Sequence, residues 1–173
     1  VMRDMGAGLS VEPRATAGGE PLGDIHAWPQ PLSPARIGGE LLVRSIDEVP
    51  ILCALATRGD GTTVIRDAEE LRVKESDRVR AMADVLRAFG VECEELADGL
   101  RVVGTPAPLR GADVTSRGDH RVAMTACILG LLAGEPTTVR DVECIRTSFP
   151  RFVGTMRALG ARIEVVAADS GMH

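Results

Sequence analysis

The stretch LRVKESDR, residues 71–78, concentrates charged groups that could do chemistry. It holds three cations and two acids, Arg72, Lys74, Arg78, Glu75 and Asp77. A helical pattern follows, so we expect Ser76 to be the N-cap and Arg78 to lie in the first turn. A cation there opposes the helix dipole, which places about half a positive charge at the N-terminus. A bound anion would explain the arginine, because backbone N–H groups and a guanidinium would converge on a phosphate or carboxylate.

The same placement recurs at GDHRVAM, residues 118–124. Asp119 is the expected N-cap of this second helix, which puts His120 first and Arg121 second. Taken alone, either arginine is best explained by an ion pair with a neighbouring acid. His120 likewise has a simple explanation as a polar residue at a helix start. Two arginines at equivalent positions of a repeat favour an anion site instead.

Other residues near expected helix starts are candidates for ligand contact or proton transfer. Lys74 can reach a ligand, although an isolated lysine is more often solvated. Glu75 is a candidate acid–base group, with ion pairing as the alternative. Asp47 is expected first of all to cap a helix of its own. Arg146 lies near a third helix start, for which Ser148 is the expected cap.

The composition excludes several classes of protein. With 173 residues, 45% of them hydrophobic, the chain can bury a core, and its net charge of −5 argues against a nucleic-acid surface. No apolar run is long enough to span a bilayer, and the start VMRDMGAGLS lacks a signal-peptide pattern. We therefore expect a cytoplasmic protein that binds neither nucleic acid nor membrane.

The four cysteines have no metal-ligand spacing and lie beside apolar residues, so we expect reduced thiols. The common motifs for nucleotide binding, serine hydrolysis and zinc proteolysis are also missing. Anion binding together with acid–base groups remains as the chemistry to explain.

A repeat of about seventy residues must position these groups. Helix ends at Gly6, Gly90 and Gly160 are each followed by an alternating, strand-like pattern. Two longer blocks begin at Asp47 and Asp119 and read alike, with an apolar run and then a β-rich segment. Each unit is predicted to run helix, strand, loop, helix, strand, in an α/β arrangement.

Individual elements follow from the same patterns. Apolar residues at helical spacing predict an amphipathic helix that ends at Gly90, and the helix after Asp119 is apolar nearly all round, so it should be buried. TTVIRD, TTVRDV and RIEVV are predicted strands, and Asp98–Gly99 should turn a hairpin. Gly59 and Gly134 are expected helix stops. Residues 12–40 are rich in Gly and Pro and are expected to be loop with short strands, with Trp28 as a packing residue.

EELRVKESDR, GDHRVAMTACILGLLAG and CIRTSFPRF together resemble the 5-enolpyruvylshikimate-3-phosphate synthase family, over about residues 20–166. The resemblance implies an inside-out α/β fold with two domains, each of three similar β-α-β-α-β-β units, and an active site between the domains. Residues 1–173 would form most of one domain, in the C-terminal part of the enzyme. Because the chain opens within a helix end, we expect a truncated start and a missing N-terminal domain. The repeat units would span about 1–75, 76–147 and 148–166.

The resemblance also implies a reaction, in which the enolpyruvyl group of phosphoenolpyruvate moves to the 5-hydroxyl of shikimate 3-phosphate without a cofactor. By matched position, Asp47 would take the hydroxyl proton, and Lys74 and Glu75 would contact the substrates and shuttle protons. Arg78 and Arg121 would clamp phosphoenolpyruvate. Some family members carry asparagine in place of Glu70 and lysine in place of Thr147. The further candidate ligands are His120, Arg146 and Thr147.

Two other functions compete with this one. Enolpyruvyl transfer to UDP-N-acetylglucosamine shares the fold, although RVKESDR favours shikimate phosphate. A non-catalytic anion-binding domain would need only the arginines, so the joint presence of Asp47 and Glu75 favours an enzyme. The chain by itself is expected to be inactive.

Overall fold

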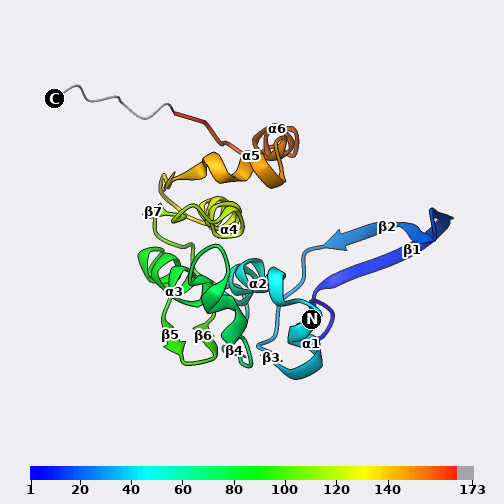
Figure 1. Ribbon diagram of the computed structural model, residues 1–173, viewed down its shortest axis with the longest axis horizontal. Helices are drawn as coiled ribbons and strands as arrows, with labels where there is room; N and C mark the ends of the chain where they lie inside the picture. The colour runs from blue at the N-terminus through cyan, green and yellow to red at the C-terminus, as the bar shows by residue number, and fades with distance from the viewer. Residues whose placement is uncertain (167–173) are drawn as a thin grey trace.

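The computed structural model describes residues 1–166, and its middle forms one complete repeat unit (Figure 1). This unit comprises β3 (Arg36–Ile37), α1 (Gly39–Val43), α2 (Val49–Ala56), β4 (Thr62–Ile65), α3 (Arg78–Ala88), β5 (Cys93–Leu96) and β6 (Gly99–Val103). Short 3-10 turns, η1 (Ile46–Glu48) and η2 (Glu69–Val73), precede α2 and α3. β3 and β4 are parallel, and β6 and β5 continue the sheet antiparallel in the order β3-β4-β6-β5. The predicted β-α-β-α-β-β order and α/β class are confirmed.

The next unit repeats the first half of this pattern. β7 (Asp113–Thr115) and β8 (Thr138–Arg140) form a parallel pair, with α4 (His120–Gly130) as the crossover between them. The chain then passes through η3 (Val142–Cys144) to α5 (Ile145–Ser148) and α6 (Phe152–Ala158), which cover α4 from the far side (Figure 1). The predicted strand RIEVV is wrong, because residues 161–166 have no strand partner.

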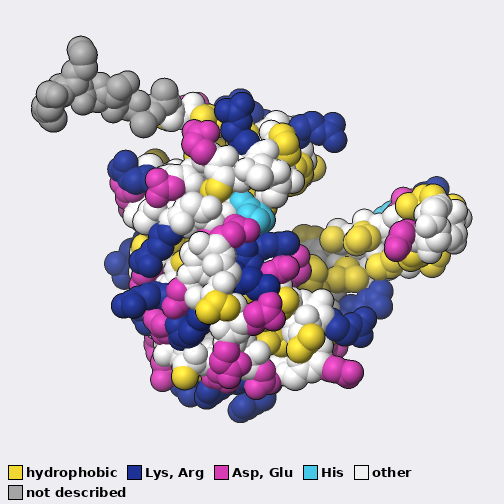
Figure 2. Space-filling model, in the orientation of Figure 1, with side chains coloured by type: hydrophobic (Ala, Val, Ile, Leu, Met, Phe, Trp, Pro, Cys, Tyr) yellow, Lys and Arg dark blue, Asp and Glu magenta, His cyan; other side chains and the backbone are white. Residues whose placement is uncertain are grey.

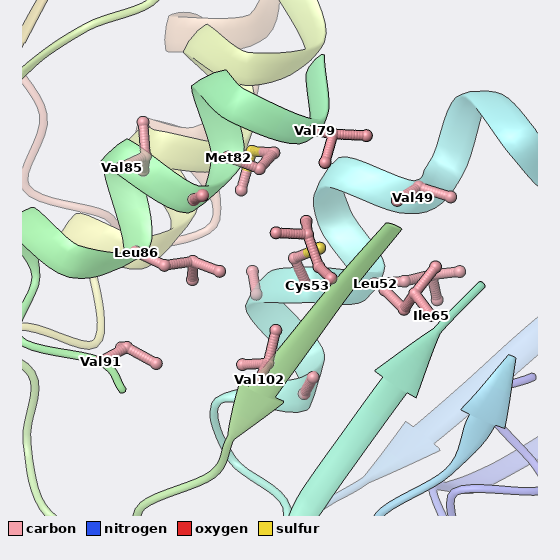
Figure 3. Packing of buried hydrophobic residues seen from close by; sticks show 14 of the residues in the cluster. Val49, Leu52, Cys53, Ile65, Val79, Met82, Val85, Leu86, Val91 and Val102 are labelled. Atoms are coloured by element: carbon pink, nitrogen blue, oxygen red, sulfur yellow. The ribbon is translucent and has the colours of Figure 1, made fainter. Parts of the chain in front are cut away.

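The main core lies between the four-stranded sheet and helices α2 and α3 (Figure 3). Val79, Met82 and Leu86 of α3 are buried there, as their helical spacing predicts. α4 separates this core from a smaller one, because Val122 belongs to the first cluster and Ala123 to the second. A helix that contacts two cores needs apolar residues on most of its circumference, which confirms the prediction that α4 is buried.

All four cysteines are free thiols, as predicted. Cys53 is fully buried in the main core, and this burial raises the pKa of its thiol well above the ordinary range. Burial also raises the pKa of Cys93 and of Cys127 to about 11. None of these three sulfurs is therefore a reactive thiolate near neutral pH.

Three helix ends share one geometry and support the predicted repeat. Gly6, Gly90 and Gly160 have φ of 78, 79 and 92°, in the left-handed region. In each case the glycine N–H donates to the carbonyl three residues back, and the next N–H donates to the carbonyl five residues back. This is the Schellman arrangement, which glycine permits at no steric cost. The helix stops expected at Gly59 and Gly134 are displaced, because α2 ends at Ala56 and α4 at Gly130.

The segment predicted to be loop with short strands is a long hairpin. β1 (Gly8–Ala17) and β2 (Glu20–Trp28) pair antiparallel and project from the body of the molecule (Figure 1). Gly18 and Gly19 both have positive φ, which makes the two-residue turn that matches the twist of a hairpin. Trp28 lies against Gly8 and is 51% exposed, so it packs on backbone and not in a core.

Within residues 1–166, no helix is long and apolar enough to cross a bilayer. The predicted hairpin β5–β6 is present, with Ala97 and Asp98 between Leu96 and Gly99. Gly99 is needed for close approach, because a Cβ there would lie 2.0 Å from the carbonyl oxygen of Ile65. Its role is therefore packing against β4 and not turn flexibility.

Candidate active site

The N-terminus of α3 is capped by Asp77 and not by Ser76. The Asp77 carboxylate accepts a hydrogen bond from the Arg80 N–H, so Arg78 is the first helical residue. The predicted cap fails because the Ser76 hydroxyl donates instead to Asp119, at 3.1 Å. Arg72, which the sequence left without a function, pairs with Asp77 at 2.9 Å and is structural.

Arg78 is the centre of the site, and its side chain is only 3% exposed. Its Nε donates to Asp119 Oδ2 at 2.7 Å, and its Nη1 donates to Asp47 Oδ1 at 3.0 Å. Its Nη2 lies 3.5 Å from Glu75 Oε1. Each guanidinium nitrogen thus faces a different carboxylate, and only Asp119 is fully buried among the three.

Asp119 caps α4, as predicted. Its Oδ1 accepts hydrogen bonds from the backbone N–H groups of Arg121 and Val122. The two charged side chains that are buried within the described part of the chain are Arg78 and Asp119, and they contact each other. A buried charge needs such a partner, since leaving either one unpaired would cost several kcal/mol.

Asp47 does not cap a helix, which corrects the prediction. It lies in η1, and the N-cap position of α2 is Glu48, whose side chain makes no capping bond. The Asp47 carboxylate instead faces two cations, Arg78 and Lys74, whose Nζ is 3.8 Å away. The Asp47 side chain therefore serves ion pairing and not helix capping.

Lys74 is held between acids on both sides. Its ammonium contacts Glu70, and Asp47 lies on its other side. The hydrogen bond to Glu70, and secondarily the charge of Asp47, raise the pKa of Lys74 above its ordinary value. Lys74 is therefore a cation at neutral pH, suited to contact an anion.

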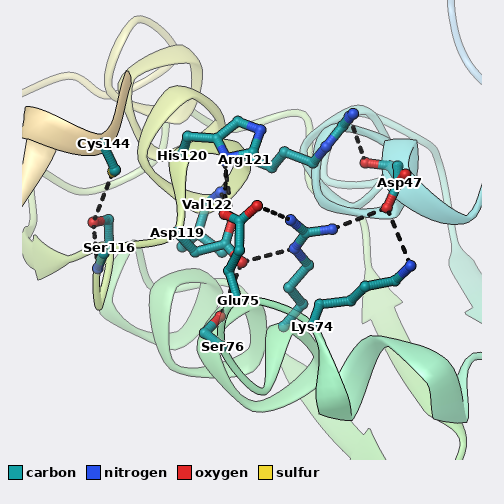
Figure 4. Close-up of polar contacts among 12 residues, drawn as sticks. Asp47, Lys74, Glu75, Ser76, Ser116, Asp119, His120, Arg121, Val122 and Cys144 are labelled. Atoms are coloured by element: carbon teal, nitrogen blue, oxygen red, sulfur yellow. Dashed lines mark hydrogen bonds and ion pairs between the residues drawn. The ribbon is translucent and has the colours of Figure 1, made fainter. Parts of the chain in front are cut away.

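The start of α4 brings two more predicted residues to the same place. His120 Nδ1 lies 2.8 Å from Glu75 Oε2, and the histidine side chain is 18% exposed. Arg121 Nη1 donates to the Asp47 carbonyl oxygen and to Glu48 Oε1, each at 2.8 Å. Figure 4 shows five predicted side chains close together, namely Asp47, Lys74, Glu75, His120 and Arg121. Arg78 pairs with two of them, Asp47 and Glu75.

Two candidate ligands lie elsewhere. Arg146 and Thr147 are exposed residues of α5, and Arg146 lies 3.9 Å from Glu143. Within residues 1–166, neither side chain makes a hydrogen bond or ion pair with the group around Arg78. The predicted cap Ser148 is wrong too, because it ends α5, while the N-cap of α6 is Arg151.

The site is internally neutralised. Acidic and basic side chains intermix on the face of the molecule seen in Figure 2, with no separate patch of one sign. Ligand atoms of Glu75, Asp119 and His120 lie within 4.8 Å of one another, a grouping that could hold a cation. Both oxygens of Asp119 are already occupied, one by the α4 cap and one by Arg78. These contacts fit an arginine-centred site better than a metal site.

Sequence reasoning missed the contact between Asp119 and Arg78. The sequence pattern assigned Asp119 to helix capping and, as an alternative, to an ion pair with Arg121, because both describe only neighbours along the chain. The contact joins residues 41 positions apart, so only the fold reveals it.

Comparison with known proteins identifies relatives for most of the chain. The family model described as EPSP synthase (3-phosphoshikimate 1-carboxyvinyltransferase) matches residues 1–156. A 3-phosphoshikimate 1-carboxyvinyltransferase of Geobacter sp. (strain M21) is 47% identical over 156 residues, which are 90% of this chain and 36% of the relative. The chain thus spans little more than a third of the length of that relative.

Solved structures agree in fold. EPSP synthase from Acinetobacter baumannii superposes with a TM-score of 0.90 at 34% identity, over 96% of this chain and 39% of that one. The enolpyruvyl transferase NikO from Streptomyces tendae gives a TM-score of 0.68 at 23% identity, over 96% of this chain and 35% of that one, and shows a shared fold.

Proposed function

The chain belongs to the EPSP synthase (3-phosphoshikimate 1-carboxyvinyltransferase) family, and from this premise we propose that it supplies one domain of an enolpyruvyl transferase. The reaction moves the enolpyruvyl group of phosphoenolpyruvate to the 5-hydroxyl of shikimate 3-phosphate, a step of aromatic amino acid biosynthesis. Residues 1–173 form most of one domain, and the other domain belongs to the rest of a longer polypeptide. The protein works in the cytoplasm and needs no cofactor.

One observation carries the proposal, namely the gathering of three cations and two acid–base candidates from two repeat units around Arg78. Both proposed substrates are anions that carry phosphate. A guanidinium offers paired N–H donors to a phosphate or carboxylate, and Lys74 adds a point charge. Acid–base groups beside such a clamp are what proton transfer to and from bound anions requires.

The present contacts indicate how the site accepts an anion. Nη1 and Nη2 of Arg78 are occupied by Asp47 and Glu75, and Arg121 by Glu48. Phosphoenolpyruvate takes over these donor atoms, which frees the two carboxylates beside Arg78. Asp47 then accepts the proton of the attacking hydroxyl as its oxygen bonds to C2 of phosphoenolpyruvate, while C3 takes a proton from Glu75 or Lys74. C3 then gives up a proton as the bond between C2 and the phosphate oxygen breaks, and inorganic phosphate leaves. The clamp holds the reacting atoms in position for attack.

His120 is proposed to orient Glu75 through their 2.8 Å contact. Arg146 and Thr147 remain candidate ligands, which would require contacts that the present arrangement lacks. The unit limits near residues 75 and 147 likewise stay a prediction. The four-stranded sheet is built from residues 36–103, so it crosses the limit predicted near residue 75.

A chimera tests the function. The matching 39% of the Acinetobacter baumannii enzyme is replaced by this chain, and the release of phosphate from phosphoenolpyruvate in the presence of shikimate 3-phosphate is measured. We expect activity that falls by about a hundredfold or more with Asp47→Asn or Lys74→Ala, the usual range for acid–base groups. Glu94→Gln, on the exposed side of β5, is the matched control and should leave the rate unchanged. A folded chimera whose turnover is unchanged by Asp47→Asn would contradict the proposal.

The chain alone should show no turnover, because one domain supplies only one side of the substrate site. Phosphate release by the purified 173-residue chain, above that of Lys74→Ala, would overturn this expectation. A competition assay in the active chimera, with shikimate 3-phosphate against UDP-N-acetylglucosamine, distinguishes the two acceptors.

A further inference from the structure

We propose that Asp119 is a positioning residue, whose buried carboxylate fixes the Arg78 guanidinium and the start of α4 in one arrangement. Its position in the fold suggests this role, since it lies where α3 and α4 begin and contacts both helices. The identity of the anion rests on the proposed function above. The link between Asp119 and Arg78 does not, and it can be tested without any substrate.

The two carboxylate oxygens of Asp119 accept hydrogen bonds from different groups. Oδ1 accepts the N–H groups of Arg121 and Val122 and so orients the first turn of α4. Oδ2 accepts Arg78 Nε at 2.7 Å and the Ser76 hydroxyl at 3.1 Å. Because one rigid carboxylate makes both sets of contacts, the guanidinium cannot shift relative to α4 without breaking a hydrogen bond.

This geometry sets which edge of Arg78 remains for a ligand. A guanidinium is planar, so an anchored Nε fixes the directions of Nη1 and Nη2. Those two nitrogens face Asp47 and Glu75 on the exposed side of the pair. His120 and Arg121 directly follow Asp119 in the chain, so the same anchor sets their starting points. One buried carboxylate thereby directs cationic groups of two repeat units toward the same ligand site.

An amide cannot replace this carboxylate. In Asp119→Asn the side-chain oxygen can still cap α4, since asparagine is a good N-cap. Its NH2 group would then face Nε of Arg78, and two donors would oppose each other. Asp119→Ser also keeps a capping hydroxyl but cannot reach Arg78. Both variants therefore separate helix capping from the positioning of Arg78.

Nitrogen-15 NMR of the 173-residue chain measures that positioning directly. We expect the Nε–H signal of Arg78 to be shifted from those of the exposed arginines and to exchange slowly with water. In Asp119→Asn and Asp119→Ser its exchange should accelerate at least tenfold, while the backbone N–H groups of Arg121 and Val122 stay protected. Asp113→Asn is the matched control, because it removes one charge from an exposed pair with Arg140.

Three results would overturn the proposal. The Nε–H of Arg78 could stay equally protected in both variants, or the α4 amides could lose protection together with it. Both Asp119 variants could also unfold while Asp113→Asn folds, which would make Asp119 a structural residue only. Titration with phosphoenolpyruvate then separates the two proposals. The wild-type signals could stay unchanged on addition of phosphoenolpyruvate while the protection of the Arg78 Nε–H still depends on Asp119. In that case the positioning role stands and the substrate assignment fails.

Discussion

At the scale of single residues, the two arginines that the sequence treats as equivalent have different environments. Arg78 is 3% exposed and pairs with a buried acid, whereas Arg121 is 29% exposed and pairs with Glu48. Residue types and spacing were enough to predict that both lie at helix starts. They could not predict the burial, because the partner of Arg78 comes from a helix 41 residues later.

This difference predicts unequal losses of stability. Arg78→Leu leaves Asp119 buried without its counter-ion, which typically costs about 3–5 kcal/mol. Arg121→Leu removes a partly exposed ion pair, which is worth about 0–1 kcal/mol. Urea unfolding followed by circular dichroism gives both free energies. Equal losses in the two variants would mean that Arg78 is not buried against Asp119 in solution.

At the scale of elements, the predictable parts are those with a strong local period. α3, α4 and the β5–β6 hairpin follow from apolar spacing and turn residues. The 3-10 turn around Asp47 was missed because side-chain ion pairs with other elements override capping preference there. The strand pattern after Gly6 predicted the start of β1, but its long pairing with β2 was missed although Gly18–Gly19 is a hairpin signal, since surrounding Gly and Pro residues hid the alternation.

Two glycines test how tightly elements pack. Gly99→Ala would place a Cβ 2.0 Å from the Ile65 carbonyl oxygen, and such overpacking costs about 1–3 kcal/mol. Gly154 in α6 has no neighbouring atom within 4 Å, so Gly154→Ala should stabilise the protein by about 0.4–1 kcal/mol. Thermal unfolding of the two variants measures both effects. A neutral Gly99→Ala would contradict the close approach of β6 to β4.

The hairpin turn also gives a pH dependence. The Asp67 N–H and then the Arg66 side chain hydrogen-bond Asp98, which lowers the pKa of this carboxyl below its ordinary value. Ionised Asp98 therefore contributes stability that is complete above about pH 4, the ordinary range of an aspartate, and is lost as the pH falls through the lowered pKa. Asp98→Asn should unfold more easily at pH 7 but lose less stability than wild type between pH 5 and about pH 2. Urea unfolding of both proteins at these pH values measures the difference. If Asp98→Asn kept the pH dependence of the wild type, the contacts assigned to Asp98 would be contradicted.

At the scale of the whole molecule, the chain combines a packed body with a projecting hairpin (Figure 1). The hairpins β1–β2 and β5–β6 each follow a left-handed glycine and occupy the same place in the repeat. β5–β6 covers the core helices, whereas β1 and β2 pack on each other. An isolated two-stranded hairpin is only marginally stable in water. Stability is therefore expected to reside in the body, whose core includes Met5, and not in the β1–β2 hairpin.

A matched pair of substitutions tests this division. Ile25 in β2 and Leu100 in β6 stand at corresponding places of the two hairpins, but Ile25 is 74% exposed and Leu100 is 0% exposed. Leu100→Ala should cost about 2–5 kcal/mol, the usual loss for a buried leucine. Ile25→Ala should change the free energy of unfolding by less than about 0.5 kcal/mol, as at other exposed sites. Urea unfolding of the 173-residue chain measures both. A loss above 2 kcal/mol for Ile25→Ala would mean that the apolar side of β1–β2 is covered in solution.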